Sequence, residues 1–78
     1  MPEFETIEFN SSVIERAGYD ADSQTLRVNI KGDARNPARV YDYFGVPVAV
    51  WHGFCVADSA GSYYTSQIKG KFNSIRVS

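Results

Sequence analysis

Hydrophobic residues in the first half of the chain follow the two-residue period of β-strands. From residue 26 to residue 31, aliphatic and polar side chains alternate strictly, with Leu26, Val28 and Ile30 on one side. This pattern predicts a strand with one buried and one solvated face. Residues 13–19 and 39–44 are two further candidate strands. A polar turn at 20–24 and a Gly-, Asn- and Pro-containing loop at 32–37 separate the three.

The period changes to that of a helix after Pro47, a residue that suits the first turn of a helix. Apolar side chains then recur on one helical face, at Val50, Trp51, Phe54 and Ala57. We expect Trp51 to be the centre of the core, against the aliphatic face of the 26–30 strand. Asp58 or Ser59 ends this helix and can cap the next one.

A second helical stripe consists of Tyr64, Ile68 and Phe72, and Ile75 extends it. Gly70 lies inside this stripe, where it costs about 1 kcal/mol relative to Ala. We therefore expect the second helix to fray or bend at Gly70.

Strands followed by helices predict an α+β fold: a small antiparallel meander of about three strands, followed by two helices packed on one face. We assign residues 11–78 to this domain and residues 1–10 to an acidic N-terminal arm. Phe4, Ile7 and Phe9 lie in the arm without a clean period, so the arm either adds an edge strand or frays. A chain of 78 residues forms a single domain with a thin core.

The net charge of −1 hides an asymmetry along the chain. Residues 1–30 carry six acidic and two basic side chains, whereas residues 31–78 carry three acidic and six basic ones. The single cysteine excludes an internal disulfide, and no apolar run approaches the length that spans a bilayer. We therefore expect a cytoplasmic protein without membrane association.

The sequence offers little catalytic chemistry. His52 and Cys55 stand at i and i+3 of the first predicted helix, but a nucleophile pair also needs a third group to orient the imidazole. Two ligands are also too few for a structural zinc site. We predict that the protein is not an enzyme, uses no cofactor and binds no metal, and that Cys55 is an inert apolar filler.

Arg39, Tyr41 and Tyr43 share one face of the third predicted strand. A cation beside two aromatic rings is what a single-stranded nucleic-acid platform uses, and Lys69 and Lys71 could add phosphate contacts. The alternative, which we favour narrowly, is that both rings build the core against Trp51 and Phe54.

The chain resembles the KTSC domain, which is named for the C-terminus of some lysyl-tRNA synthetases and also occurs as a free-standing small protein in bacteria and phages. Short matches in a fixed order carry the resemblance: Ser11-Ser12-x-Ile14, Gly18-Tyr19-Asp20, Leu26/Val28/Ile30, Tyr41-x-Tyr43, Val46-Pro47, Ser59-x-Gly61-x-Tyr63-Tyr64 and Ile68. The resemblance implies no established activity, and RNA binding is suggested from the synthetase context.

We therefore predict a small non-enzymatic binding domain, with RNA as the ligand that the resemblance suggests. Candidate binding residues are Arg39, Tyr41, Tyr43, Lys69 and Lys71. A near-equal alternative is a protein-interaction module, such as a phage-type inhibitor of a host protein, that binds no nucleic acid. Association with a second copy is also left open.

Overall fold

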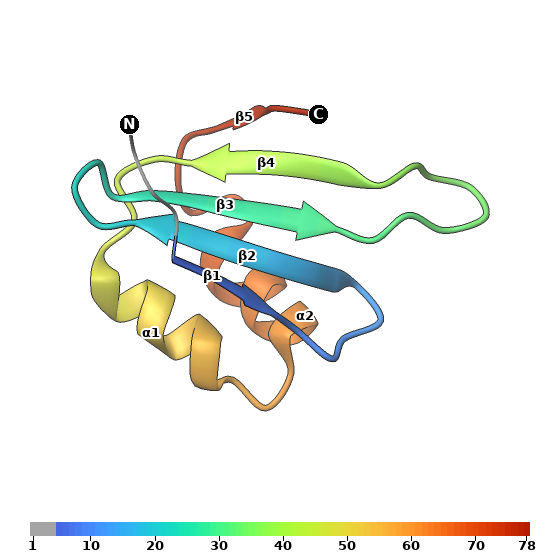
Figure 1. Cartoon of the computed structure of the whole chain (residues 1–78), viewed down its shortest axis with the longest axis horizontal. Helices are drawn as coiled ribbons and strands as arrows, with labels where there is room; N and C mark the ends of the chain where they lie inside the picture. The colour runs from blue at the N-terminus through green and yellow to red at the C-terminus, as the bar shows by residue number, and fades with distance from the viewer. Residues whose placement is uncertain (1–4) are drawn as a thin grey trace.

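An antiparallel sheet of five strands forms one layer of the molecule in a computed structural model, which describes residues 5–78 (Figure 1). The strands lie in the sheet in chain order: β1 (Glu5–Glu8), β2 (Ile14–Asp20), β3 (Thr25–Ile30), β4 (Arg39–Tyr43) and β5 (Ser74–Arg76). Each strand pairs antiparallel with the next. The predicted 13–19, 26–30 and 39–44 strands correspond to the central β2, β3 and β4.

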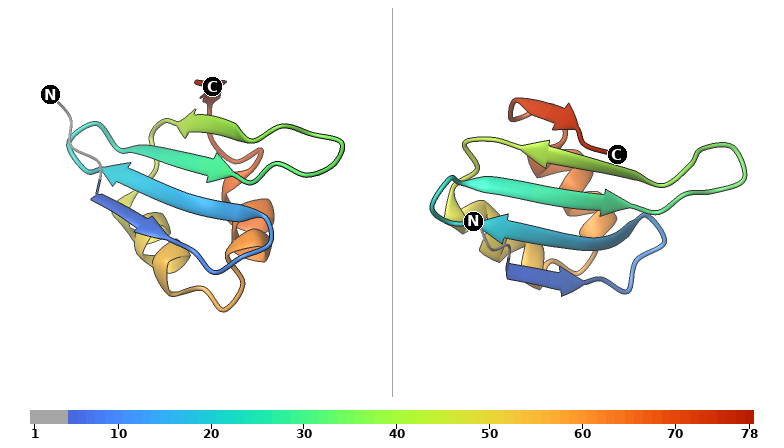
Figure 2. Two further views of the ribbon diagram at one scale, coloured as in Figure 1. Left: turned by 45° about the vertical axis from the view of Figure 1, so that its right-hand side comes forward. Right: turned by 45° about the horizontal axis from the view of Figure 1, so that its top comes forward.

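The helical segment joins β4 to β5 and covers one face of the sheet, leaving the opposite face without helices (Figures 1 and 2). Helix α1 spans Val48–Val56, with Pro47 immediately before it. Helix α2 (Ala60–Tyr63) continues directly into a π-helical turn, η1 (Tyr64–Ile68). The Ser59 side chain accepts a hydrogen bond from the Ser62 amide at 3.2 Å, which confirms its predicted capping role.

The predicted α+β class, with an antiparallel sheet and two helices, is confirmed, but the predicted count of about three strands is wrong. One additional strand, β1, lies in the N-terminal arm and pairs with β2. The other, β5, contains Ile75, which we had assigned to the second helical stripe. That helix ends at Ile68, and Gly70 then takes a φ of +78°, a left-handed conformation that glycine adopts without steric cost.

The core lies between the sheet and the helices, and Trp51 is its centre as predicted. Trp51 is 1% exposed, within the same buried cluster as Leu26 and Val28. Its indole stacks on Tyr19, with ring centroids 5.7 Å apart. The Tyr19 hydroxyl in turn donates to the Val46 carbonyl at 2.6 Å, so the strand β2 is tied to the segment before α1.

The arm contributes to this core through Phe9, although the irregular spacing of its apolar residues does not predict a core position. The Phe9 ring stacks on Phe54 at a centroid distance of 4.7 Å, and Ile7 packs against the same cluster. Tyr63 stacks on Phe54 as well, at 5.7 Å. Residues 5–9 therefore pack as part of the domain, and Phe4 lies outside the described residues.

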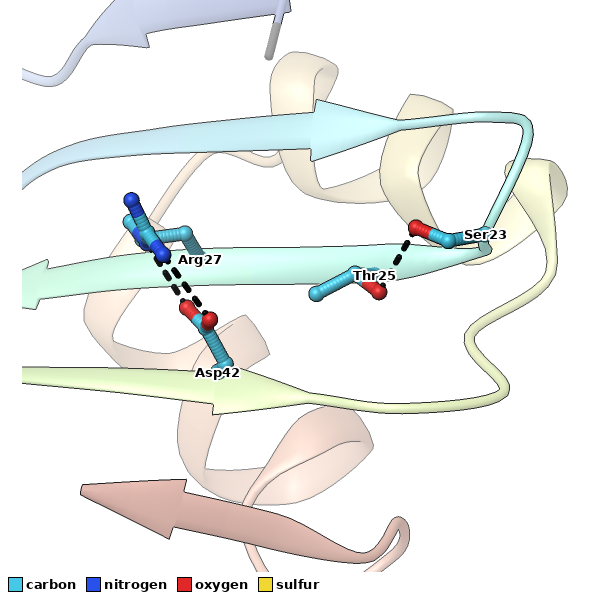
Figure 3. Close-up of polar contacts among 4 residues, drawn as sticks. All are labelled: Ser23, Thr25, Arg27 and Asp42. Atoms are coloured by element: carbon cyan, nitrogen blue, oxygen red, sulfur yellow. Dashed lines mark hydrogen bonds and ion pairs between the residues drawn. The ribbon is translucent and has the colours of Figure 1, made fainter. Parts of the chain in front are cut away.

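The helix-free face of the sheet carries an ion pair between Arg27 on β3 and Asp42 on β4, which are direct partners in the strand register. The Arg27 Nε and Nη2 atoms donate to the two Asp42 carboxylate oxygens at 2.8 and 3.0 Å (Figure 3). Asp42 is only 8% exposed, so this carboxylate is satisfied mainly by protein. Ser23 and Thr25 share a further hydrogen bond on the same side, at 2.8 Å.

Within residues 5–78, no helix has the length and apolar character needed to cross a membrane. The cytoplasmic location stays a prediction.

Candidate functional site

A hollow of about 550 Å³ opens between the helix-covered face of β4 and the end of the helical segment. Its volume lies in the range of small-ligand sites in proteins. We call it the aromatic pocket. Its lining comes from four parts of the chain: Val13, Ile30, Arg39, Tyr41, Tyr43, Tyr64, Thr65, Lys69, Gly70, Phe72 and Ser74.

Strand alternation explains how β4 contributes three of these side chains. Arg39, Tyr41 and Tyr43 occupy alternate positions of β4 and so point to the same side of the sheet, toward the helices. Asp42 points to the opposite side, where it meets Arg27. The antiparallel register places Ile30 opposite Arg39, which brings the end of β3 into the pocket wall.

The wall of the pocket that is closest to the core is a pair of tyrosines. The Tyr43 and Tyr64 hydroxyl oxygens are 2.5 Å apart, and the two rings meet edge to face at a centroid distance of 5.9 Å. Burial is the main cause that raises the pKa of Tyr64 well above its usual range, and the hydrogen bond to Tyr43 is the second cause. Burial raises the pKa of Tyr43 as well. Both phenols therefore stay protonated near neutral pH, and the pair uses only one of its two protons internally.

The sequence left open whether Tyr41 and Tyr43 belong to the core or to a binding surface, and the structure gives the two residues different positions. Tyr43 is 4% exposed and belongs to the core, whereas Tyr41 is half-buried at its margin. Their ring centroids lie 6.4 Å apart in a tilted arrangement. Tyr43 belongs to the same buried cluster as Trp51 and Phe54, and Tyr41 packs against that cluster. The rings that stack directly on Trp51 and Phe54 are those of Tyr19, Phe9 and Tyr63.

Two cations contribute to the pocket from elements far apart in the sequence. Arg39 starts β4, and Lys69 follows η1, where its amide donates to the Tyr64 carbonyl at 2.8 Å. None of the described residues that line the pocket is acidic. The pocket thus combines positive charge, an accessible ring at Tyr41 and several hydroxyls, a set that suits an anionic ligand with a flat group.

The structure brings together four of the five predicted binding residues. Arg39, Tyr41, Tyr43 and Lys69 all line the aromatic pocket, but Lys71 does not. Lys71 is exposed in the turn after Gly70, and its amide donates to the Ile68 carbonyl at 3.0 Å. The sequence prediction missed Ser74, since the return of β5 beside β4 was not foreseen. It also missed Tyr64 and Thr65 of η1, because their spacing indicated only a core-facing helix.

The residues considered for catalysis lie elsewhere. His52 is exposed on α1, and Cys55, on the same helix, is partly buried against the core. Neither lines the aromatic pocket. Among the residues from 5 to 78, no three histidine, cysteine or acidic side chains cluster in a way that could hold a metal ion.

A family model and a solved structure both point to one family. The KTSC domain model matches residues 10–72. A protein of the bacterium Tsukamurella paurometabola is 34% identical over 67 residues, which cover 86% of this chain and 92% of that protein. The crystal structure of a KTSC domain protein from Yersinia pestis superposes with a TM-score of 0.83 at 29% identity, covering 97% of this chain and all of that one. This chain belongs to the KTSC domain family.

Proposed function

We propose that this KTSC domain binds single-stranded RNA through the aromatic pocket, without catalysing a reaction. The observation that carries the proposal is the convergence of Arg39, Tyr41 and Lys69 on one hollow, in which no lining residue between 5 and 78 is acidic. An unpaired base stacked on a protein ring contributes about 1–3 kcal/mol to binding. Cations beside such a ring attract the neighbouring phosphates.

The chemistry of the pocket favours a local site over a broad basic surface. A net charge of −1 does not suit a protein that coats nucleic acid through charge alone. The free proton of the Tyr43–Tyr64 hydroxyl pair offers a hydrogen bond to the edge of a base. Affinity would then depend on a few side chains.

The proposal is tested by titrating a fluorescently labelled single-stranded RNA at low salt and following its anisotropy. Lys69→Gln should weaken binding and lower the slope of log K against log salt by about one, because one phosphate contact is lost. The matched control is Lys71→Gln, which removes the same charge two residues away, outside the pocket lining. It should leave both the affinity and the slope nearly unchanged.

The stacking contribution is tested separately with Tyr41→Leu, which keeps an apolar side chain at the margin of the core. Loss of the ring should weaken binding by about 5- to 150-fold, corresponding to 1–3 kcal/mol. The absence of binding by the wild type at high micromolar protein would refute the RNA proposal. Equal effects of Lys69→Gln and Lys71→Gln would refute the assignment to this pocket.

A protein partner is the second candidate, and a different surface supports it. Phe44, Ile75 and Val77 lie along the paired β4 and β5 segments and are 40%, 57% and 46% exposed. Exposed apolar side chains that lie close together are typical of interaction surfaces. If the domain acts as an inhibitor or adaptor, Ile75→Ser should abolish capture of the partner, whereas Lys69→Gln should not.

A further inference from the structure

A second hollow, of about 510 Å³, adjoins the aromatic pocket, and we call it the hydroxyl groove. Val13 and Thr65 line both hollows, so the two lie side by side at these side chains. Six of the eight residues that the structure describes in the lining are small hydroxyl residues, and none of the eight is charged: Ser11, Ser12, Val13, Ser59, Gly61, Ser62, Thr65 and Ser66. Such a surface can form hydrogen bonds without contributing charge.

The local hydrogen bonds divide four of these six hydroxyls into two kinds. Thr65 and Ser66 each donate their proton to a backbone carbonyl one helical turn earlier, on Gly61 and Ser62, at 2.9 Å. Their oxygens are therefore left as acceptors toward the groove.

The second kind of hydroxyl is left as a donor. The Ser11 oxygen accepts from the Val13 and Ile14 amides at 3.1 and 3.2 Å. The Ser59 oxygen accepts from the Ser62 amide. Both serines thus keep their O–H proton for an outside acceptor. The groove presents donors and acceptors side by side, an arrangement that matches ribose hydroxyls and phosphate oxygens.

We propose that the hydroxyl groove is a second subsite, which holds the ribose of the nucleotide next to the one in the aromatic pocket. This inference rests on the proposed function and deepens it: the ligand is an RNA segment at least two nucleotides long. The Thr65 and Ser66 oxygens accept a hydrogen bond from the ribose 2′-hydroxyl, the group that DNA lacks. The subsite therefore selects RNA over DNA, and the aromatic pocket holds the ligand by charge and stacking.

The first test compares oligouridines of increasing length with 2′-deoxyuridine oligomers of the same lengths, by calorimetry on the wild-type chain. We expect affinity to rise from the mononucleotide to the trinucleotide. We also expect RNA to bind about two- to tenfold more tightly than its deoxy counterpart, the value of one hydrogen bond. Equal affinities for all lengths, or for RNA and DNA, would overturn the second subsite.

The second test uses a Thr65→Val, Ser66→Ala double variant, which removes both acceptor oxygens with little change in shape. The ratio of RNA to DNA affinity should fall toward one, while the salt slope stays that of the wild type because no charge has changed. Gln67→Ala is the matched control, since Gln67 is exposed on the same turn and lines neither hollow. A double variant that keeps the wild-type ratio would also overturn the inference.

A third measurement covers the case in which the double variant does not fold. Amide chemical shifts of the wild type should move around Ser59–Ser62 on addition of triuridylate, but not on addition of uridine monophosphate. Shifts confined to the aromatic pocket with both ligands would leave the proposed function intact and refute the second subsite. If neither ligand moves any resonance, the proposed function fails, and this inference fails with it.

Discussion

The Arg27–Asp42 pair allows the energy of one ion pair in this small sheet to be measured directly. The Arg27 side chain is 41% exposed and the Asp42 side chain 11%, so the pair is intermediate between a surface and a buried salt bridge. Exposed pairs contribute about 0.2–1 kcal/mol, whereas removing one partner of a fully buried pair costs about 3–5 kcal/mol. Because Arg27 remains partly hydrated, we expect a coupling energy of about 1 kcal/mol.

The perturbation is a double-mutant cycle with Arg27→Met and Asp42→Asn, each chosen to preserve side-chain size. Arg27→Met should cost about 1–2 kcal/mol of unfolding free energy, since it leaves a nearly buried carboxylate without its guanidinium. The double variant should be less destabilised than the sum of the two single variants. The cycle cancels the other contacts of each residue, which the single substitutions do not.

Urea unfolding followed by tryptophan fluorescence is a suitable assay, because the single tryptophan, Trp51, is 1% exposed and reports on the core. Glu15 and Arg16, adjacent in the sequence, form a more exposed ion pair that serves as a control. Their charged atoms are 3.5 Å apart, and both side chains are 47% exposed. The cycle for this pair should give a coupling near zero at 1 M salt. A coupling below about 0.2 kcal/mol for Arg27 and Asp42 would refute the reasoning from burial.

Further predictions concern the core, the pocket and the helix end. Trp51→Ala should cost about 3–5 kcal/mol and leave little folded protein in a thermal melt followed by circular dichroism. Because burial raises the pKa values of Tyr43 and Tyr64, their contribution to stability should be complete below about pH 9 and should be lost as the pH rises past the ordinary tyrosine value of about 10, where the unfolded chain ionises first. In Tyr64→Phe this alkaline fall should be smaller. Gly70→Ala should destabilise by about 1–2 kcal/mol in urea, from its positive φ alone, because no described atom beyond residues 69–71 lies within 4 Å of the added methyl group. Cys55→Ser should leave RNA affinity unchanged; loss of binding by a folded variant would contradict the inert role.

How far the sequence predicted this fold depends on how much each element is determined by local pattern. The alternation through Leu26 and Val28, and the helical spacing of Trp51 and Phe54, identify β3 and α1 directly. The strand β5 could not be found this way, because it has three residues, all exposed, and its Ile75 happens to continue a helical stripe. Its position is set by pairing with β4, a non-local contact.

Prediction of the candidate site was limited in the same way, because local pattern does not reveal non-local contacts. Alternation placed Arg39, Tyr41 and Tyr43 on one side of a strand, and the structure agrees. Whether that side was core or surface depended on what covers it, and the helical segment covers Tyr43 more completely than Tyr41. The separation of Lys69 from Lys71 depended on the left-handed turn at Gly70, which periodicity alone does not indicate.

The strand β5 also has a consequence for how the protein moves. It is short, exposed and paired on one side only within the described residues, so its amide protons should exchange through local opening at much lower free energy than those of β3. Ser74 of this strand lines the aromatic pocket, so each local opening of β5 would open the pocket on that side. Among the strand amides, hydrogen exchange should therefore be faster in β5 than in β3. A ligand bound in the pocket should slow exchange in β5 while leaving exchange in β3 unaffected.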